Sequence, residues 1–171
     1  MSVNRYSLSD HTLKMTFPTY NTNANGLGRI SGLQLQFGGA GNNGQQGSFV
    51  GSISVARSTT TWTTAGDPTG SWVHNKNLDR TGTITLNLRQ VSDDVIRLTT
   101  IARILENDMS EAAGFKLEIF SSNKPVAIAE DCYISQVPNQ EYGETAAEQS
   151  WTFTCGRITF QRDVELSQER V

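Results

Sequence analysis

Apolar residues recur at every second position in several stretches of this chain. The clearest stretch is 82–90, where Ile84, Leu86 and Leu88 alternate with threonine and asparagine. Successive side chains of a β-strand point to opposite faces, so this spacing predicts a strand with one buried face. The same alternation predicts strands within 33–37, 49–55, 115–119, 127–137 and 151–160. The chain is therefore predicted to be mainly β.

One segment has the period of a helix. Leu98, Ile101, Ala102 and Leu105 recur at i, i+3, i+4 and i+7, which predicts a helix over about residues 93–106. Ser92 is expected to cap this helix, and Asp93 and Asp94 would lie favourably at the positive end of its dipole. We expect its apolar stripe to close the core.

Two further patterns predict how strands are joined. Residues 58–64 are rich in β-branched residues and precede a turn at 66–70, which predicts a strand and a hairpin. The last two β runs flank residues 138–149, and simple antiparallel pairing sets Cys132 opposite Cys155 and Ile134 opposite Phe153. Because residues 1–10 contain no apolar signal segment, both thiols are expected to be reduced rather than joined.

Composition excludes several classes of function. The 171 residues carry a net charge of -3 with a pI of about 5.4, which argues against a protein that grips phosphate backbones. Serine, threonine, asparagine and glutamine make up 57 residues, whereas only 18% are charged, so the surface is predicted to be neutral and polar. No run approaches the roughly 18 apolar residues of a membrane span. We therefore expect no membrane partner.

The common catalytic motifs are missing. Residues 39–44 match G-x-G-x-x-G, but a strand-like segment follows them where a dinucleotide site needs a helix. A four-ligand zinc site would have to gather His11, His74 and both cysteines from distant strands. We predict no enzyme, no cofactor and no metal.

The stretch from 125 to 156 has acidic residues and no basic ones. Its acidic residues are Glu130, Asp131, Glu141, Glu144 and Glu148. Such a cluster is consistent with simple solvation, with a wall that repels a polyanion, or with a docking surface for a basic partner patch. The sequence alone leaves these three interpretations open.

A small β domain with open strand edges and polar loops suits a structural subunit. An exposed edge offers unpaired N–H and C=O groups to another chain. Identical copies that meet head to tail form a ring when the rotation closes. The sequence therefore favours a self-assembling subunit over an enzyme.

Three stretches resemble the tail tube proteins of tailed bacteriophages. Residues 65–72 are similar to a glycine-rich turn before the family's central strand, and 81–98 are similar to its strand-Ser-helix segment. Asp93 stands where many relatives have proline. The most specific stretch is 132–154, with a strand, a Pro-containing loop, a Tyr-Gly turn, an acidic spacer and a final Trp-aromatic strand.

The resemblance implies a β-sandwich or split β-barrel with one flanking helix. Residues 1–162 would form the single domain, with extended loops at about 18–32 and 38–47, and 163–171 would be a tail that is mobile until assembly. Hexameric rings would stack into a hollow tube through which DNA passes without specific binding. The protein would belong to the virion tail, assemble in the host cytoplasm, and meet itself and sheath, baseplate and tail-terminator proteins.

The resemblance also directs attention to particular residues. A lumen should be polar and neutral or acidic so that DNA slides, and the residues of that character are Ser52, Ser54, Thr83, Thr85 and Asn87. They are equally consistent with an ordinary solvent-facing side of a sheet. Predicted contacts between subunits or rings are Trp72, Gly41, Asn42, Asn43, Asp163 and Glu165.

Two other functions fit the same residues. The tube of a contractile secretion or injection system shares the fold and ring but carries effectors instead of DNA. A carbohydrate-binding β-sandwich is suggested by the three tryptophans and the many asparagine and glutamine residues. Stable monomers that bind glycans would favour the second alternative.

Overall fold

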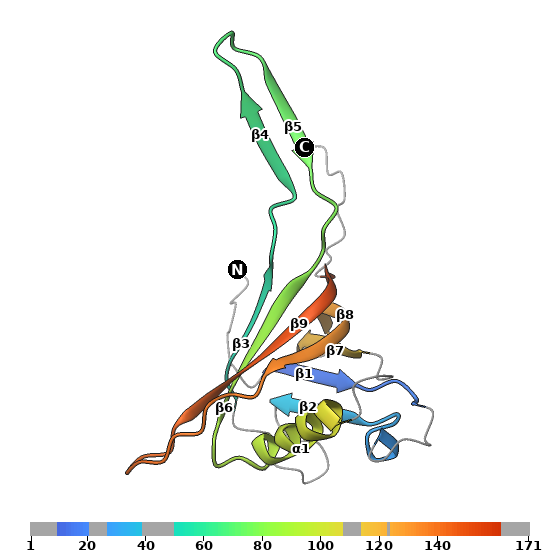
Figure 1. Cartoon of the computed structure of the whole chain (residues 1–171), viewed down its shortest axis with the longest axis vertical. Helices are drawn as coiled ribbons and strands as arrows, with labels where there is room; N and C mark the ends of the chain where they lie inside the picture. Colours follow the sequence, from blue (N-terminus) through green and yellow to red (C-terminus); the bar gives the residue numbers. More distant parts are fainter. Residues whose placement is uncertain (1–9, 21–26, 39–49, 108–113, 123, 162–171) are drawn as a thin grey trace, which may run out of the picture.

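The protein consists of a seven-stranded antiparallel sheet with one helix and a long two-stranded arm (Figure 1). This computed structural model describes residues 10–20, 27–38, 50–107, 114–122 and 124–161. Among these residues, no helix is long and apolar enough to cross a membrane.

Seven strands form the main sheet in the order β2-β1-β7-β8-β9-β6-β3. Along the chain they are β1 (His11–Thr16), β2 (Gln34–Gly38), β3 (Val50–Arg57), β6 (Gly82–Arg89), β7 (Phe115–Ser121), β8 (Lys124–Gln136) and β9 (Glu148–Phe160). All neighbours are antiparallel. Within the described residues the sheet stays open, with β2 and β3 as its two edges.

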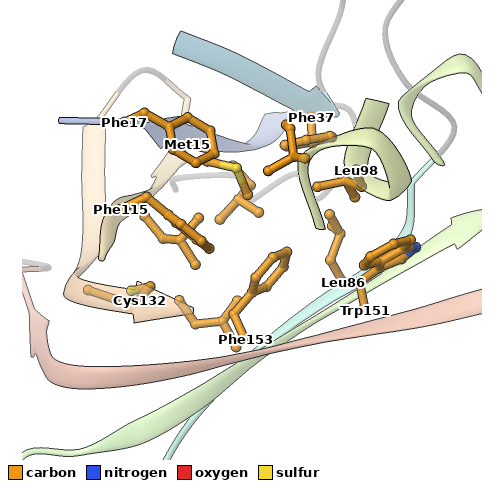
Figure 2. Close-up of a cluster of buried hydrophobic side chains, with 14 of the residues drawn as sticks. Met15, Phe17, Phe37, Leu86, Leu98, Phe115, Cys132, Trp151 and Phe153 are labelled. Atoms are coloured by element: carbon orange, nitrogen blue, oxygen red, sulfur yellow. The ribbon is translucent and has the colours of Figure 1, made fainter. Parts of the chain in front are cut away.

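The apolar faces of the strands enclose one core (Figure 2). Phe115 of β7 packs between Phe17 and Phe153, with ring centroids 5.2 and 5.8 Å away. Helix α1 (Asp93–Asn107) contributes Leu98 and completes the core beside Trp151. The prediction of a mainly β, sandwich-like fold with one flanking helix is confirmed.

The predicted pairing of the last two long strands is also confirmed. Cys132 lies opposite Cys155 and Ile134 lies opposite Phe153 in the β8–β9 ladder. Both thiols are free and buried. The side-chain hydrogen bond with Cys155, together with burial, raises the pKa of Cys132 above that of an exposed thiol.

The start of α1 differs from the expected cap in one respect. The helix begins at Asp93 as predicted, and the Ser92 carbonyl accepts a hydrogen bond from the Val95 amide at 3.2 Å. The Ser92 hydroxyl, however, is buried and has no hydrogen-bond partner, so the prediction of a side-chain cap is wrong. Asp94 instead forms an ion pair with Arg97 at 3.7 Å, one turn along the helix.

The arm is the hairpin of β4 (Trp62–Gly66) and β5 (Trp72–Lys76), inserted between β3 and β6. It confirms the predicted hairpin and extends well beyond the sheet along the longest axis of the molecule (Figure 1).

Of the loop predicted at 18–32, the described parts pack on the core. They include the short 3-10 helix η2 (Leu27–Arg29) and three buried side chains, Tyr20, Leu27 and Ile30. Residues 39–47 of the second predicted loop, and the tail 163–171, lie outside the described residues.

Candidate assembly surfaces

The five residues assigned to a tube lumen lie together on one face of the main sheet. The register sets Ser52 opposite Asn87 and Ser54 opposite Thr85, while the apolar residues between them point into the core. Directly opposed side chains of an antiparallel pair point to the same side of a sheet. Ser52, Ser54, Thr83, Thr85 and Asn87 therefore all face away from the core.

The structure adds three residues that sequence analysis missed. Ser150, Thr152 and Thr154 of β9 lie opposite Asn87, Thr85 and Thr83. Their signal was present, because they alternate with the apolar Trp151 and Phe153, but only the β6–β9 register shows that they extend the same face. We call these eight serine, threonine and asparagine residues the polar face.

Hydrogen bonds across three strands order this face. Asn87 donates from Nδ2 to the Ser52 hydroxyl at 2.5 Å, and its Oδ1 accepts from the Ser150 hydroxyl at 2.5 Å. Arg89 and Glu148 form the opposed pair at the end of the β6–β9 ladder. The polar face itself is uncharged.

The arm has no buried residue in either strand. Gly66 lies opposite Trp72, Thr64 opposite His74, and Trp62 opposite Lys76. Because opposed residues share a face, both tryptophans lie on one side of the arm, which we call the Trp face. Its side chains contact one another: Lys76 lies 5.5 Å above the ring of Trp62, and Thr64 hydrogen-bonds His74 at 2.8 Å.

The tip of the arm is a well-ordered turn. The Asp67 carboxylate accepts hydrogen bonds from the backbone amides of Thr69 and Ser71 at 2.8 and 3.0 Å, and from the Thr69 hydroxyl. These bonds, first the one from the Thr69 hydroxyl, lower the pKa of Asp67 below its usual value. Gly70 has a φ of 89°, which glycine adopts without strain. The tip is therefore ordered by hydrogen bonds within its own turn.

A groove of about 650 Å³ opens between the start of α1 and the segment that joins β8 to β9. Gln90 ties that segment in place: its side chain accepts from the Glu141 amide at 3.3 Å and its amide donates to the Ala147 carbonyl at 3.0 Å. Helix α1, whose first residues line this groove, lies at the opposite end of the molecule from the arm (Figure 1). We call this groove the end groove.

The end groove combines exposed apolar walls with a buried polar group. Val91, Ile96 and Tyr142 line it and are 73%, 63% and 84% exposed. Gln149 also lines it, is only 3% exposed, and has no hydrogen-bond partner for its Oε1. Buried polar atoms without partners are rare in folded proteins, and the indole N–H of Trp151, two residues along β9, is also buried without a partner.

The three tryptophans have different environments. Trp151 is fully buried in the core, whereas Trp62 and Trp72 are 57% and 68% exposed on the arm. They therefore do not share one platform, which a carbohydrate site built on all three would need. Among predicted contact residues, Gly41, Asn42, Asn43, Asp163 and Glu165 lie outside the described residues.

The described residues contain no group of three or more histidine, cysteine or acidic side chains placed to hold a metal ion.

Comparison with known proteins identifies relatives of this chain. The sequence model of the family described as bacteriophage PhiTE tail tube protein matches residues 30–162. The solved structure of the anti-feeding prophage cap, a tube-terminating cap, is similar with a TM-score of 0.46 and 11% identity, over 94% of each chain. No curated protein sequence matches.

Proposed function

The chain belongs to the family of the bacteriophage PhiTE tail tube protein, and we propose that its copies form hexameric rings that stack into a hollow tail tube for DNA. The polar face carries this proposal. It is a patch of eight uncharged polar side chains on β3, β6 and β9, and it reaches a sheet edge at β3.

Ring closure would use the two open edges of the main sheet. The β3 edge, with sequence VGSISVAR, has neither the proline nor the lysine that commonly blocks edge-to-edge pairing. Pairing of β3 with a neighbouring copy would continue the polar face from subunit to subunit around a lumen. The hydrophobic core and α1 would then lie on the outer side of this inner sheet, away from the lumen.

The arm would connect successive rings. At about 3.3 Å per residue, its strands and turn extend roughly 30 Å from the sheet, and a two-stranded ribbon alone is marginally stable in water. Stacking would cover its exposed surface. We propose no catalytic activity, and we propose assembly in the host cytoplasm with sheath, baseplate or terminator proteins meeting the tube at its surface and ends.

Electron microscopy of the concentrated full-length protein tests the proposal. We expect hollow tubes from the wild type. A variant in which a short glycine-asparagine turn replaces residues 62–76 should give monomers with an unchanged melting temperature. Tubes from the armless variant would show that the arm is dispensable, and a wild type that stays monomeric at every concentration would refute the proposal.

Chemical labelling tests the position of the polar face. Thr154, an exposed member of that face, is changed to cysteine. A bulky polymer-linked maleimide should label this thiol in monomers and be excluded from it in tubes, whereas a small maleimide should label both. If the bulky maleimide labels monomers and tubes equally, the polar face lies on the outer wall.

A further inference from the structure

The two cysteines of the chain lie against each other in the main sheet. Cys132 of β8 and Cys155 of β9 are the only two cysteines of the sequence, and they form a directly opposed pair in the β8–β9 ladder. Opposed residues of an antiparallel pair have Cα atoms about 4.5–5.5 Å apart, and a disulfide needs about 4.4–6.8 Å. Because the two side chains also hydrogen-bond each other, their sulfur atoms can be joined with no change of strand register.

We propose that Cys132 and Cys155 form a modification site, at which a hydroperoxide converts the two thiols into a disulfide within one chain. The site uses none of the residues of the polar face, the Trp face or the end groove. Both strands belong to the same copy, so the reaction does not depend on the proposed tube.

The backbone beside the pair has an unusual conformation. Asp131, the residue before Cys132, has a φ of 54°, which is uncommon for residues other than glycine and costs free energy. A Cβ at Gly156, the residue after Cys155, would lie 3.4 Å from the Asp131 Cβ. The ladder is therefore expected to open locally more easily at this point than along its regular parts.

Burial decides which oxidants reach the site. Cys132 is fully buried in the core (Figure 2) and Cys155 is 4% exposed. A bulky disulfide such as oxidised glutathione must bring a third sulfur into contact with the attacking thiolate, and a closely packed core has no space for it. Hydrogen peroxide is little larger than water, so a brief local opening is enough to admit it.

The two thiols are not equivalent. The thiolate is the reactive form of cysteine. The hydrogen bond from Cys132 stabilises the thiolate of Cys155 and lowers the pKa of Cys155, whereas the same bond and burial raise the pKa of Cys132. Cys155 is therefore the thiol that reacts with peroxide, and Cys132 is the thiol that completes the disulfide.

The reaction uses one peroxide for each disulfide. The Cys155 thiolate attacks one peroxide oxygen and the O–O bond breaks. The departing hydroxide takes up the proton that Cys155 released, and a sulfenic acid remains. The Cys132 sulfur then attacks the Cys155 sulfur, the S–O bond breaks, and the Cys132 proton leaves with the hydroxyl group as a second water. The two thiols lose two electrons in total, and the peroxide is reduced to two waters.

The disulfide would stabilise the fold. It would close the loop 133–154 and so reduce the conformational freedom of the unfolded chain. If the protein assembles in a reducing host cytoplasm, as proposed above, the bond would form only after the particle leaves the cell. This order of events rests on the proposed function, whereas the site itself does not.

Mass spectrometry of the folded full-length monomer tests the site. The protein is treated with a slight excess of hydrogen peroxide, catalase removes the excess, and free thiols are alkylated after unfolding in urea. The wild type should lose the mass of two hydrogen atoms and take up no alkylating reagent. Its melting temperature should rise by about 5–10 °C and return to the starting value after reduction. Oxidised glutathione should leave both thiols of the folded protein open to alkylation.

Peptide mapping identifies the bond. Trypsin cannot separate the two cysteines, because residues 125–156 contain neither lysine nor arginine. Cleavage after glutamate within 138–149 separates them into peptides that should stay joined until a reductant is added.

Two single variants test which thiol reacts first. Cys132→Ser keeps a hydrogen-bond donor beside Cys155 but cannot form the disulfide, so Cys155 should remain a sulfenic acid that dimedone captures when the chain is unfolded in urea. Cys155→Ser is the matched control and leaves only Cys132. Capture should be about fivefold greater in Cys132→Ser, the factor expected for one hydrogen bond. Circular dichroism checks that both variants fold, and the wild-type experiment needs neither of them.

Three results would overturn the inference. If the folded wild type keeps both thiols while the urea-unfolded chain forms the disulfide, the native pair is not a site of oxidation. Disulfides that join two copies would also refute a bond within one chain. Equal capture by dimedone in the two variants would refute the assignment of Cys155 as the thiol that reacts first. All these measurements use monomers, so they hold whether or not the protein forms tubes.

Discussion

The main sheet and the arm are built from the same kind of ladder but are stabilised differently. Each strand of the main sheet contributes apolar side chains to one core, whereas all ten strand residues of the arm are exposed. We therefore expect the sheet to fold without the arm, because burial of apolar area is the main favourable term in folding. The arm has backbone pairing, one cation–π contact and an ordered tip. Changes in the sheet should alter folding, and changes in the arm should alter assembly.

The largest effect on folding is expected at Phe153. Its ring is fully buried and contacts Phe115 edge to face. Phe153→Ala should lower the free energy of unfolding by about 4 kcal/mol, through lost transfer energy and the cavity that remains. Urea denaturation of the monomer measures this change.

Val73→Ala is the matched test on the arm. Val73 is 60% exposed, so its truncation should change the free energy of unfolding by less than about 0.5 kcal/mol. A large loss of stability in this variant would show that the arm is part of the cooperative core and would remove the distinction between the two regions.

A smaller loss of stability is expected from a substitution at Gly82, where β6 packs closely on its neighbours. A Cβ at Gly82 would lie 2.3 Å from the Ala56 carbonyl oxygen and 2.5 Å from Cδ1 of Ile158. Gly82→Ala should therefore destabilise the protein by about 2 kcal/mol, because the backbone must move. Gly143 is the control, since a Cβ there meets nothing within 4 Å, and Gly143→Ala should be nearly neutral by thermal unfolding.

The sequence predicts those parts of the fold that repeat a period. Ile84, Leu86 and Leu88 alternate without interruption, so both the strand and its buried face follow from local spacing. The opposition of Cys132 and Cys155 was predictable because the β8 and β9 runs extend evenly on both sides of their connection. The helix was predictable for the same reason, because its apolar residues recur at i, i+3 and i+4.

The surfaces were less predictable because they depend on contacts distant in sequence. The threonine-rich run before the tip indicated a strand, but not that both of its faces would be exposed. Gln149 reads as one polar residue before an alternating aromatic run. Its burial next to the end groove appears only when α1 and the segment after β8 are brought together. Ser92 shows the converse: a good capping residue stands at the helix start, but its hydroxyl is unpaired.

Alkaline pH tests the stability of the packed core, through the buried side chain of Tyr20. Burial, with a smaller contribution from nearby Tyr133, raises the pKa of Tyr20 to about 12 from its usual 10.0. The folded state therefore keeps its proton longer than the unfolded state. The associated stability is complete below pH 10 and is lost as the pH rises toward 12.

Urea unfolding at several pH values between 8 and 12 measures this loss. Tyr20→Phe cannot titrate, so its free energy of unfolding should decline less steeply over this range than that of the wild type. Identical slopes for the two proteins would show that Tyr20 does not couple core packing to pH.

Acidic pH tests the order of the arm tip, and this is the smallest effect that we expect. Hydrogen bonds lower the pKa of Asp67 below 3.8, so they favour the ionised folded tip above that pH and are lost as the pH falls through the lowered pKa. The amides of Thr69 and Ser71 should then exchange faster with solvent, while those of the main sheet keep their protection. Asp67→Asn can still accept hydrogen bonds but does not titrate. The amides at the tip of this variant should therefore keep their protection as the pH falls. If the tip and sheet of the wild type lose protection together, the arm does not open independently, and its order depends on the folded core rather than on its own turn.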